Sequence, residues 1–90
     1  MGVAETIRAK LEAALAPEVL EVKDESHLHA GHAGARPGGE SHFRLLIVSG
    51  AFAGLSRVER QRRVNAALSE ELAGPVHALA MKALTPDEYQ

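Results

Sequence analysis

A stretch without sustained periodicity, residues 24–43 (DESHLHAGHAGARPGGESHF), interrupts an otherwise patterned chain. It contains four of the five histidines, four of the eight glycines and one of the four prolines. On both sides of it, apolar and polar residues alternate as they do in strands. We therefore predict a long loop, residues 25–41, between two strands. A structureless connection of this length in a small domain is more often functional than accidental. The simpler alternative is a surface loop whose histidines contact only water.

The segments on either side of this loop have clear patterns. Residues 3–16 place apolar side chains at i, i+4, i+7 and i+8, which predicts an amphipathic helix that ends before Pro17. Residues 18–24 alternate and predict a half-buried strand at an edge of the sheet. Residues 42–49 carry apolar side chains on both faces, which favours a central strand. Phe52 in the turn that follows is expected to anchor in the core.

The second half of the chain predicts a helix, a strand and a final helical turn. Ser56 and Glu59 form a capping-box pattern that opens a helix over 56–72. Gly74 is expected to end that helix in the left-handed conformation, and a third strand is predicted over 76–84. A further helix starts at 85–86, where Thr is followed by Pro. The expected buried stripe of the long helix is Val64, Leu68 and Leu72, with Val58 beside it.

The resulting order is α-β-β-α-β-α, which predicts a single α/β domain over residues 1–90. The helix between the second and third strands indicates a parallel pair with a right-handed crossover, and the first two strands should be antiparallel. A three-stranded mixed sheet with helices on one face accounts for all the apolar stripes. Ninety residues leave no room for a second core.

Composition excludes several functional classes. The chain has no cysteine, so disulfides and thiolate ligands of its own are excluded. Its net charge of -2 provides no global positive field for DNA or membranes, and its three aromatic residues are too few for a base-stacking platform. No apolar run is long enough to span a membrane, and we expect a cytoplasmic protein. No nucleophile–base pair can be identified, so we do not expect an enzyme.

Two groups of residues remain as candidate sites. His27, His29 and His32 lie within six residues, and imidazole is the commonest protein ligand for metals. His77 is placed at the start of the third strand, near the end of the sheet where the first strand should finish. These histidines are therefore expected to converge on one surface site. The alternatives are a zinc site formed by the loop alone and, for His77, a hydrogen-bonded structural role.

The helix predicted from Ser56 carries the second group. Arg57, Arg60 and Arg63 recur every three residues along it. Such spacing favours a basic flank for an acidic partner or for phosphates, and the alternative is an ordinary solvated face.

Several motifs in order give the chain a resemblance to the BolA family over nearly its whole length. They are DES at 24–26, ESHF at 40–43, VS at 48–49, FAG at 52–54, RQRRV at 60–64, ALSEEL at 67–72, GPVHALA at 74–80 and TP at 85–86. The resemblance implies a class II KH-like fold. The family's Arg-His-Arg string reads Arg-Gln-Arg here, at 60–62.

The resemblance also implies a function. It implies partnership with a monothiol glutaredoxin around a shared [2Fe-2S] cluster, in which this chain would supply two metal ligands. These are His77 from the VHAL segment and a loop histidine. The spacing in histidine-type members selects His29, with His32 and His27 as competitors. A glutaredoxin cysteine and a glutathione thiol would complete the four ligands.

A second function follows from the same resemblance. Some BolA proteins are described as transcriptional regulators, and the KH-like fold belongs to nucleic-acid binders. DNA binding through Arg57, Arg60 and Arg63 is therefore the alternative prediction.

Overall fold

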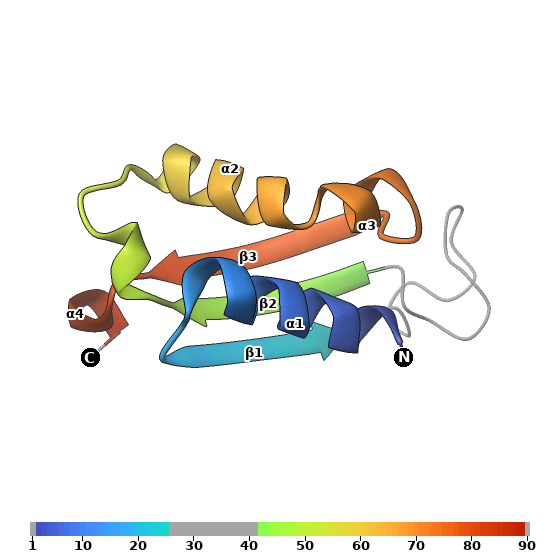
Figure 1. Ribbon diagram of the computed structural model, residues 1–90, viewed down its shortest axis with the longest axis horizontal. Coiled ribbons are helices and arrows are strands. Elements are labelled where there is room, and N and C mark those ends of the chain that lie inside the picture. Colours follow the sequence, from blue (N-terminus) through green and yellow to red (C-terminus); the bar gives the residue numbers. More distant parts are fainter. Residues whose placement is uncertain (1, 26–41, 90) are drawn as a thin grey trace.

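The computed structural model describes residues 2–25 and 42–89. The element order is α1 (Val3–Leu15), β1 (Val19–Asp24), β2 (His42–Val48), η2 (Gly50–Phe52), α2 (Arg57–Ala67), α3 (Ser69–Ala73), β3 (Ala78–Leu84) and α4 (Pro86–Tyr89). The strands form one sheet in the order β1-β2-β3, in which β1 pairs antiparallel with β2, and β2 pairs parallel with β3 (Figure 1). The predicted mixed sheet, with its central second strand, is confirmed.

The core lies between one face of this sheet and the helices α1 and α2, which Figure 1 shows on the same side of it. Strand β2 and helix α1 contribute three of its side chains each, and β2 is buried on its helix-covered face along its whole length. The buried apolar side chains are Ile7, Leu11, Leu15, Phe43, Leu45, Ile47, Phe52, Val64, Leu68 and Val76. The stripe predicted for the first helix and the anchoring of Phe52 are therefore confirmed.

The long helix predicted over 56–72 is divided in two. It begins as expected, because the Ser56 hydroxyl accepts from the Glu59 N–H and the Glu59 carboxylate accepts from the Ser56 N–H, each at 3.2 Å. It is interrupted at Leu68, whose backbone (φ -108°, ψ 21°) leaves the helical region. Leu68 is nevertheless buried, so the apolar stripe continues across the break into α3.

Three finer expectations for this region are wrong. Val58 is 56% exposed rather than beside the buried stripe. Gly74 has φ -115° rather than a left-handed conformation. Its missing side chain still matters, because a Cβ there would lie 3.3 Å from the Glu70 carbonyl oxygen. Within the described residues, positive φ angles occur instead at Ala16 (43°), at the end of α1, and at Gly54 (78°). Finally, β3 begins at Ala78, two residues later than predicted.

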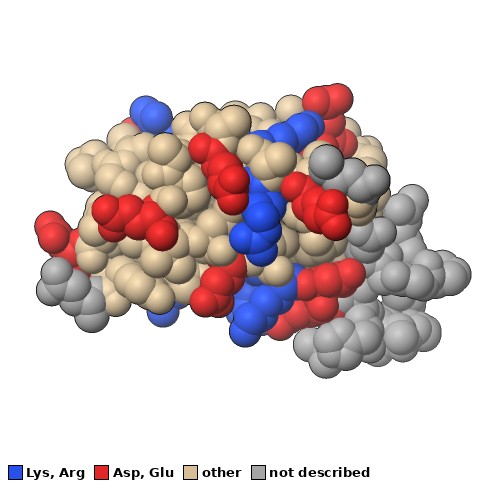
Figure 2. All heavy atoms as spheres, turned by 60° about the horizontal axis from the view of Figure 1, so that its bottom comes forward, with Lys and Arg blue, Asp and Glu red and all other residues tan. Residues whose placement is uncertain are grey.

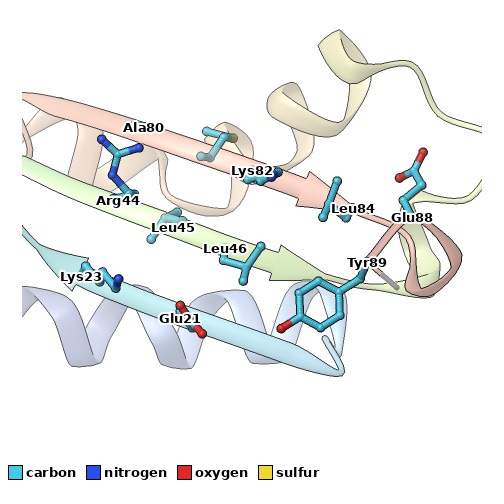
Figure 3. A pocket seen from close by; sticks show the side chains of 11 residues that line it. Glu21, Lys23, Arg44, Leu45, Leu46, Ala80, Lys82, Leu84, Glu88 and Tyr89 are labelled. Carbon is cyan, nitrogen blue, oxygen red and sulfur yellow. The ribbon is translucent and has the colours of Figure 1, made fainter.

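The face of the sheet opposite the helices is polar and concave. A groove of about 600 Å³ runs over it, with Leu46 and Leu84 in its floor and Tyr89 of α4 at one end. Figure 3 shows the charged side chains of Glu21, Lys23, Arg44 and Lys82 around these apolar groups. Within residues 2–25 and 42–89, no helix is long and apolar enough to cross a membrane.

Candidate functional site at the end of the sheet

One end of the sheet brings together three points that are distant in sequence. Strand β1 finishes there at Asp24, which lies opposite Phe43, and β2 and β3 both start there, with His42 opposite Ala78. The Glu25 N–H donates to the His42 carbonyl oxygen at 2.8 Å, so the chain on either side of residues 26–41 is held together by the sheet. The expected meeting of the first strand's end with the third strand's start is confirmed (Figure 1).

His77 is presented to solvent at this end by the turn that precedes β3. The Val76 N–H donates to the Glu71 carbonyl oxygen at 2.9 Å, and the Val76 side chain is buried in the core. The next residue, His77, is exposed and lies one position before β3 rather than within it.

A second imidazole accompanies it. The rings of His42 and His77 are stacked, with centroids 6.3 Å apart and planes inclined by 26°. The sequence placed His42 in the long stretch but suggested no role for it. The signal that would have found it is the parallel register, because His42 opens β2 opposite Ala78, and His77 directly precedes Ala78.

Imidazole nitrogens are good ligands for zinc, copper and iron. Among residues 2–25 and 42–89, no group of three or more histidine, cysteine, aspartate or glutamate side chains is placed to hold a metal ion. The predicted ligand His29, with its competitors His27 and His32, lies outside the described residues. The described part of the chain thus offers a two-imidazole surface that other ligands would have to complete.

The charges around this end are balanced. Arg44 donates from Nε to both carboxylate oxygens of Glu25 at 3.2 Å, which ties β2 to the end of β1. On the face shown in Figure 2, basic and acidic side chains lie beside one another. At this end of the sheet, the Arg44–Glu25 pair therefore places a cation beside an anion.

The three arginines predicted as a basic flank do not act alike. Arg57 and Arg63 are exposed on α2, but Arg60 is only 8% exposed. Its guanidinium donates to the Leu55 and Ala83 carbonyl oxygens at 3.0 and 3.1 Å and to the Glu88 carboxylate. The expectation that Arg60 lines an exposed flank is therefore wrong. A basic surface on α2 would depend on Arg57 and Arg63, with the exposed Arg62 between them.

Comparisons with known proteins agree on one family. The family described as "BolA-like protein" matches residues 11–88. The "BolA-like protein 1" of Bos taurus is 60% identical over 84 residues, which are 93% of this chain and 59% of that protein. The "DNA-binding transcriptional regulator BolA" of Haemophilus influenzae is 37% identical over 90 residues, covering all of this chain and 84% of that one.

Solved structures agree with the sequence matches. The BolA domain of SufE1 from Arabidopsis thaliana superposes with a TM-score of 0.85 at 48% identity, covering 94% of this chain and 93% of that one. The chain spans a little under three fifths of the length of the mammalian relatives that it matches.

Proposed function

Because the chain belongs to the BolA-like protein family, we propose that it is a non-catalytic adaptor that binds a monothiol glutaredoxin and shares a bridging [2Fe-2S] cluster with it. The observation that carries the proposal is the position of His77. It is exposed at the one end of the sheet where the chain also leaves β1 and enters β2.

The donor chemistry fits such a cluster in a shared site. A [2Fe-2S] cluster takes four ligands, and histidines replace two of the thiolates in some proteins. This chain has no thiol, so the remaining ligands would be a cysteine of the glutaredoxin and the thiol of glutathione. The proposed ligands from this chain are His77 and His29. His29 is the fourth residue after Glu25, and four extended residues span at most about 14 Å. That span keeps the proposed second ligand within reach of the sheet end.

Histidine ligation gives this proposal a physical consequence. An imidazole must be neutral to bind a metal, so protons compete with the cluster for it and cluster binding would weaken as pH falls. Histidine in place of thiolate also raises the reduction potential of the cluster. Both properties suit transfer of a cluster or sensing of iron.

The test is anaerobic cluster reconstitution with a monothiol glutaredoxin and glutathione, followed by visible absorption and circular dichroism. Wild type should give a heterodimer spectrum distinct from that of the glutaredoxin alone, and His77→Ala should alter it. His29→Ala should do the same, while His27→Ala and His32→Ala should not if His29 is the loop ligand. The proposal fails if wild type forms no complex and only the glutaredoxin's own spectrum appears.

DNA binding is a second candidate, favoured by the names of relatives such as the Haemophilus influenzae regulator. Because Arg60 is bonded within the fold, the residues available on α2 are Arg57, Arg62 and Arg63. Binding through them predicts an affinity for duplex DNA that falls steeply with salt and is lost in an Arg57→Glu, Arg63→Glu double variant. An affinity independent of salt, or unchanged in the double variant, would argue against this function.

A further inference from the structure

Among the strands of residues 2–25 and 42–89, β3 is an outer one: it pairs with β2 on one side, and no described strand covers its other side. In Figure 3 the strand that carries Ala80, Lys82 and Leu84 lies at the margin of the sheet. The exposed margin of a strand presents unpaired N–H and C=O groups, which are a template for another extended chain.

Two hydrogen bonds fix which backbone groups face outward. The Ser49 N–H donates to the Leu84 carbonyl oxygen at 2.9 Å, so Leu84 faces β2. Arg60 Nη1 donates to the Ala83 carbonyl oxygen at 3.1 Å, so Ala83 faces away from β2. Because successive residues of a strand turn their backbone groups to opposite sides, Met81 and Leu79 face outward as well. No hydrogen bond within residues 2–25 and 42–89 occupies the outward groups of these two residues.

A groove of about 480 Å³ runs beside this margin, between the start of α2 and the second half of β3. Arg60 and Glu88 of α4 also line it, and they are bonded to each other, with Arg60 bonded to Ala83 as well. Lys82 lines it from the open face of the sheet and Arg57 from the helix side. Both side chains are exposed, and neither forms an ion pair within the described residues. The cations of Lys82 and Arg57, which no described carboxylate pairs with, therefore lie on either side of the unpaired edge of β3.

These features select one kind of occupant. Alternating donors and acceptors at strand spacing complement a peptide backbone, whereas phosphates only accept hydrogen bonds. The flanking Lys82 and Arg57 favour acidic side chains. A second copy of this chain, paired through the same margin, would bring like charges together. We propose that the outer side of β3 binds an extended acidic segment of a partner protein as a fourth strand.

The pleat gives this segment a pattern. Side chains alternate between the two faces of a strand, so adjacent acidic residues would point to opposite faces. One would meet Lys82 and the next would meet Arg57. This margin is distinct from His77, which precedes the strand, so the inference is independent of the proposed cluster site.

The test uses the full chain and a fluorescein-labelled peptide of ten residues. The peptide contains several Glu-Glu pairs, with a valine between one pair and the next. Fluorescence anisotropy measures its affinity. A peptide with lysine in place of glutamate tests charge, and one N-methylated at its four central residues tests backbone pairing. We expect both changes to weaken binding by about tenfold or more. Amide hydrogen exchange at Leu79 and Met81 should slow when the acidic peptide is bound.

Variants locate the site. Lys82→Glu and Arg57→Glu should each weaken binding by about threefold or more at low salt. Arg63→Glu is the matched control, because it makes the same change of charge on α2 but lies outside the groove. It should leave the affinity within about twofold of wild type.

Four outcomes would overturn the proposal. If the N-methylated peptide bound as tightly as the unmodified one, and amide exchange at Met81 did not slow, the peptide would contact the protein through charge alone. If Arg63→Glu lost as much affinity for the peptide as Lys82→Glu and Arg57→Glu do, the peptide would be held by the general positive charge of α2 and not by this groove. A dimer that protects the same amides without peptide would make a second copy the occupant. Binding of single-stranded DNA, with no binding of the acidic peptide, would make nucleic acid the occupant.

Discussion

Arg60 is the residue whose role changes most between sequence and structure. It is charged and only 8% exposed, and its guanidinium joins the Leu55 and Ala83 carbonyl oxygens to Glu88. The guanidinium carbon also lies 6.0 Å from the centroid of the Phe52 ring. A cation so placed holds the loop before α2, the end of β3 and α4 together through one side chain.

Removal of this side chain should destabilise the fold. Arg60→Ala would leave two partly buried carbonyl oxygens and a carboxylate without their donor, at a cost of about 1–3 kcal/mol in the free energy of unfolding. Arg63→Ala, on the same helix but exposed, should change it by less than about 0.5 kcal/mol. Urea unfolding of both variants measures the difference. Equal values would show that the Arg60 network contributes nothing.

The sequence alone could not separate these arginines. Their three-residue spacing places Arg57, Arg60 and Arg63 on related faces of a helix, but burial depends on Leu55, Ala83 and Glu88, which are distant along the chain. His77 is the opposite case. The Gly-Pro turn before it and the strand pattern after it were enough to predict its position near the sheet end. Its neighbour His42 became visible only through the parallel register of β2 and β3.

The side chain of Ser49 links the helix α1, the end of the strand β2 and the short helix η2. Its buried hydroxyl donates to the Leu15 carbonyl oxygen at the end of α1 (2.7 Å) and accepts from the Ala51 N–H in η2 (3.1 Å), directly after β2. Ser49→Ala should lower the free energy of unfolding by about 1–3 kcal/mol, mainly because the carbonyl oxygen of the buried Leu15 would lose its donor. Ser69→Ala, at an exposed position, is the control in the same urea titration. A Ser49 variant as stable as the control would contradict the link.

Helix α4 should make stability depend on pH. The pKa of Glu88 is lowered from 4.5 to about 2, chiefly because its carboxylate accepts hydrogen bonds from Arg60, and then because it accepts one from the Thr85 N–H. The unfolded chain binds this proton at higher pH than the folded chain does. The stabilisation is therefore complete above about pH 4.5 and is lost as pH falls toward 2.

Glu88→Gln tests this dependence. The variant should have a lower urea midpoint than wild type at pH 7, and the gap should narrow as pH falls from 4.5 toward 2. Asp87→Asn, an exposed neighbour in the same helix, should show no such gap. A gap that stays constant across this range would mean that the carboxylate's charge does not stabilise α4.

The elements themselves were predictable where their signals are local. The capping box at Ser56 and the Thr85–Pro86 start act within one turn, and both are confirmed. The break at Leu68 was not predictable. Its side chain continues the buried apolar stripe that includes Val64. The apolar spacing in the sequence is therefore the same as that of an unbroken helix. Likewise, the start of β3 depends on pairing with His42 of β2 rather than on residues 76–77 themselves.

The described helices and strands share one core, to which the sheet and both long helices contribute. Ile7 and Leu11 come from α1, Leu45 and Ile47 from β2, and Val64 from α2, and each is at most 1% exposed. Lys10 of α1 also connects the first helix to α3, because its ammonium donates hydrogen bonds of 2.8 and 3.0 Å to the Glu71 carboxylate. The order of strands and helices was predictable because the apolar pattern admits few arrangements that bury every stripe.

A matched pair on α2 tests whether this core behaves as a unit. Val64 is fully buried and Val58 is 56% exposed, so Val64→Ala should cost about 2 kcal/mol of unfolding free energy for the lost methyl groups and the cavity. Val58→Ala should change it by less than about 0.5 kcal/mol. With a shared core, the Val64 variant should show the same lowered midpoint by circular dichroism of the helices and by amide signals of β1. A lowered midpoint for α2 alone, with β1 unfolding as in wild type, would mean that the sheet and α2 are separate cooperative units.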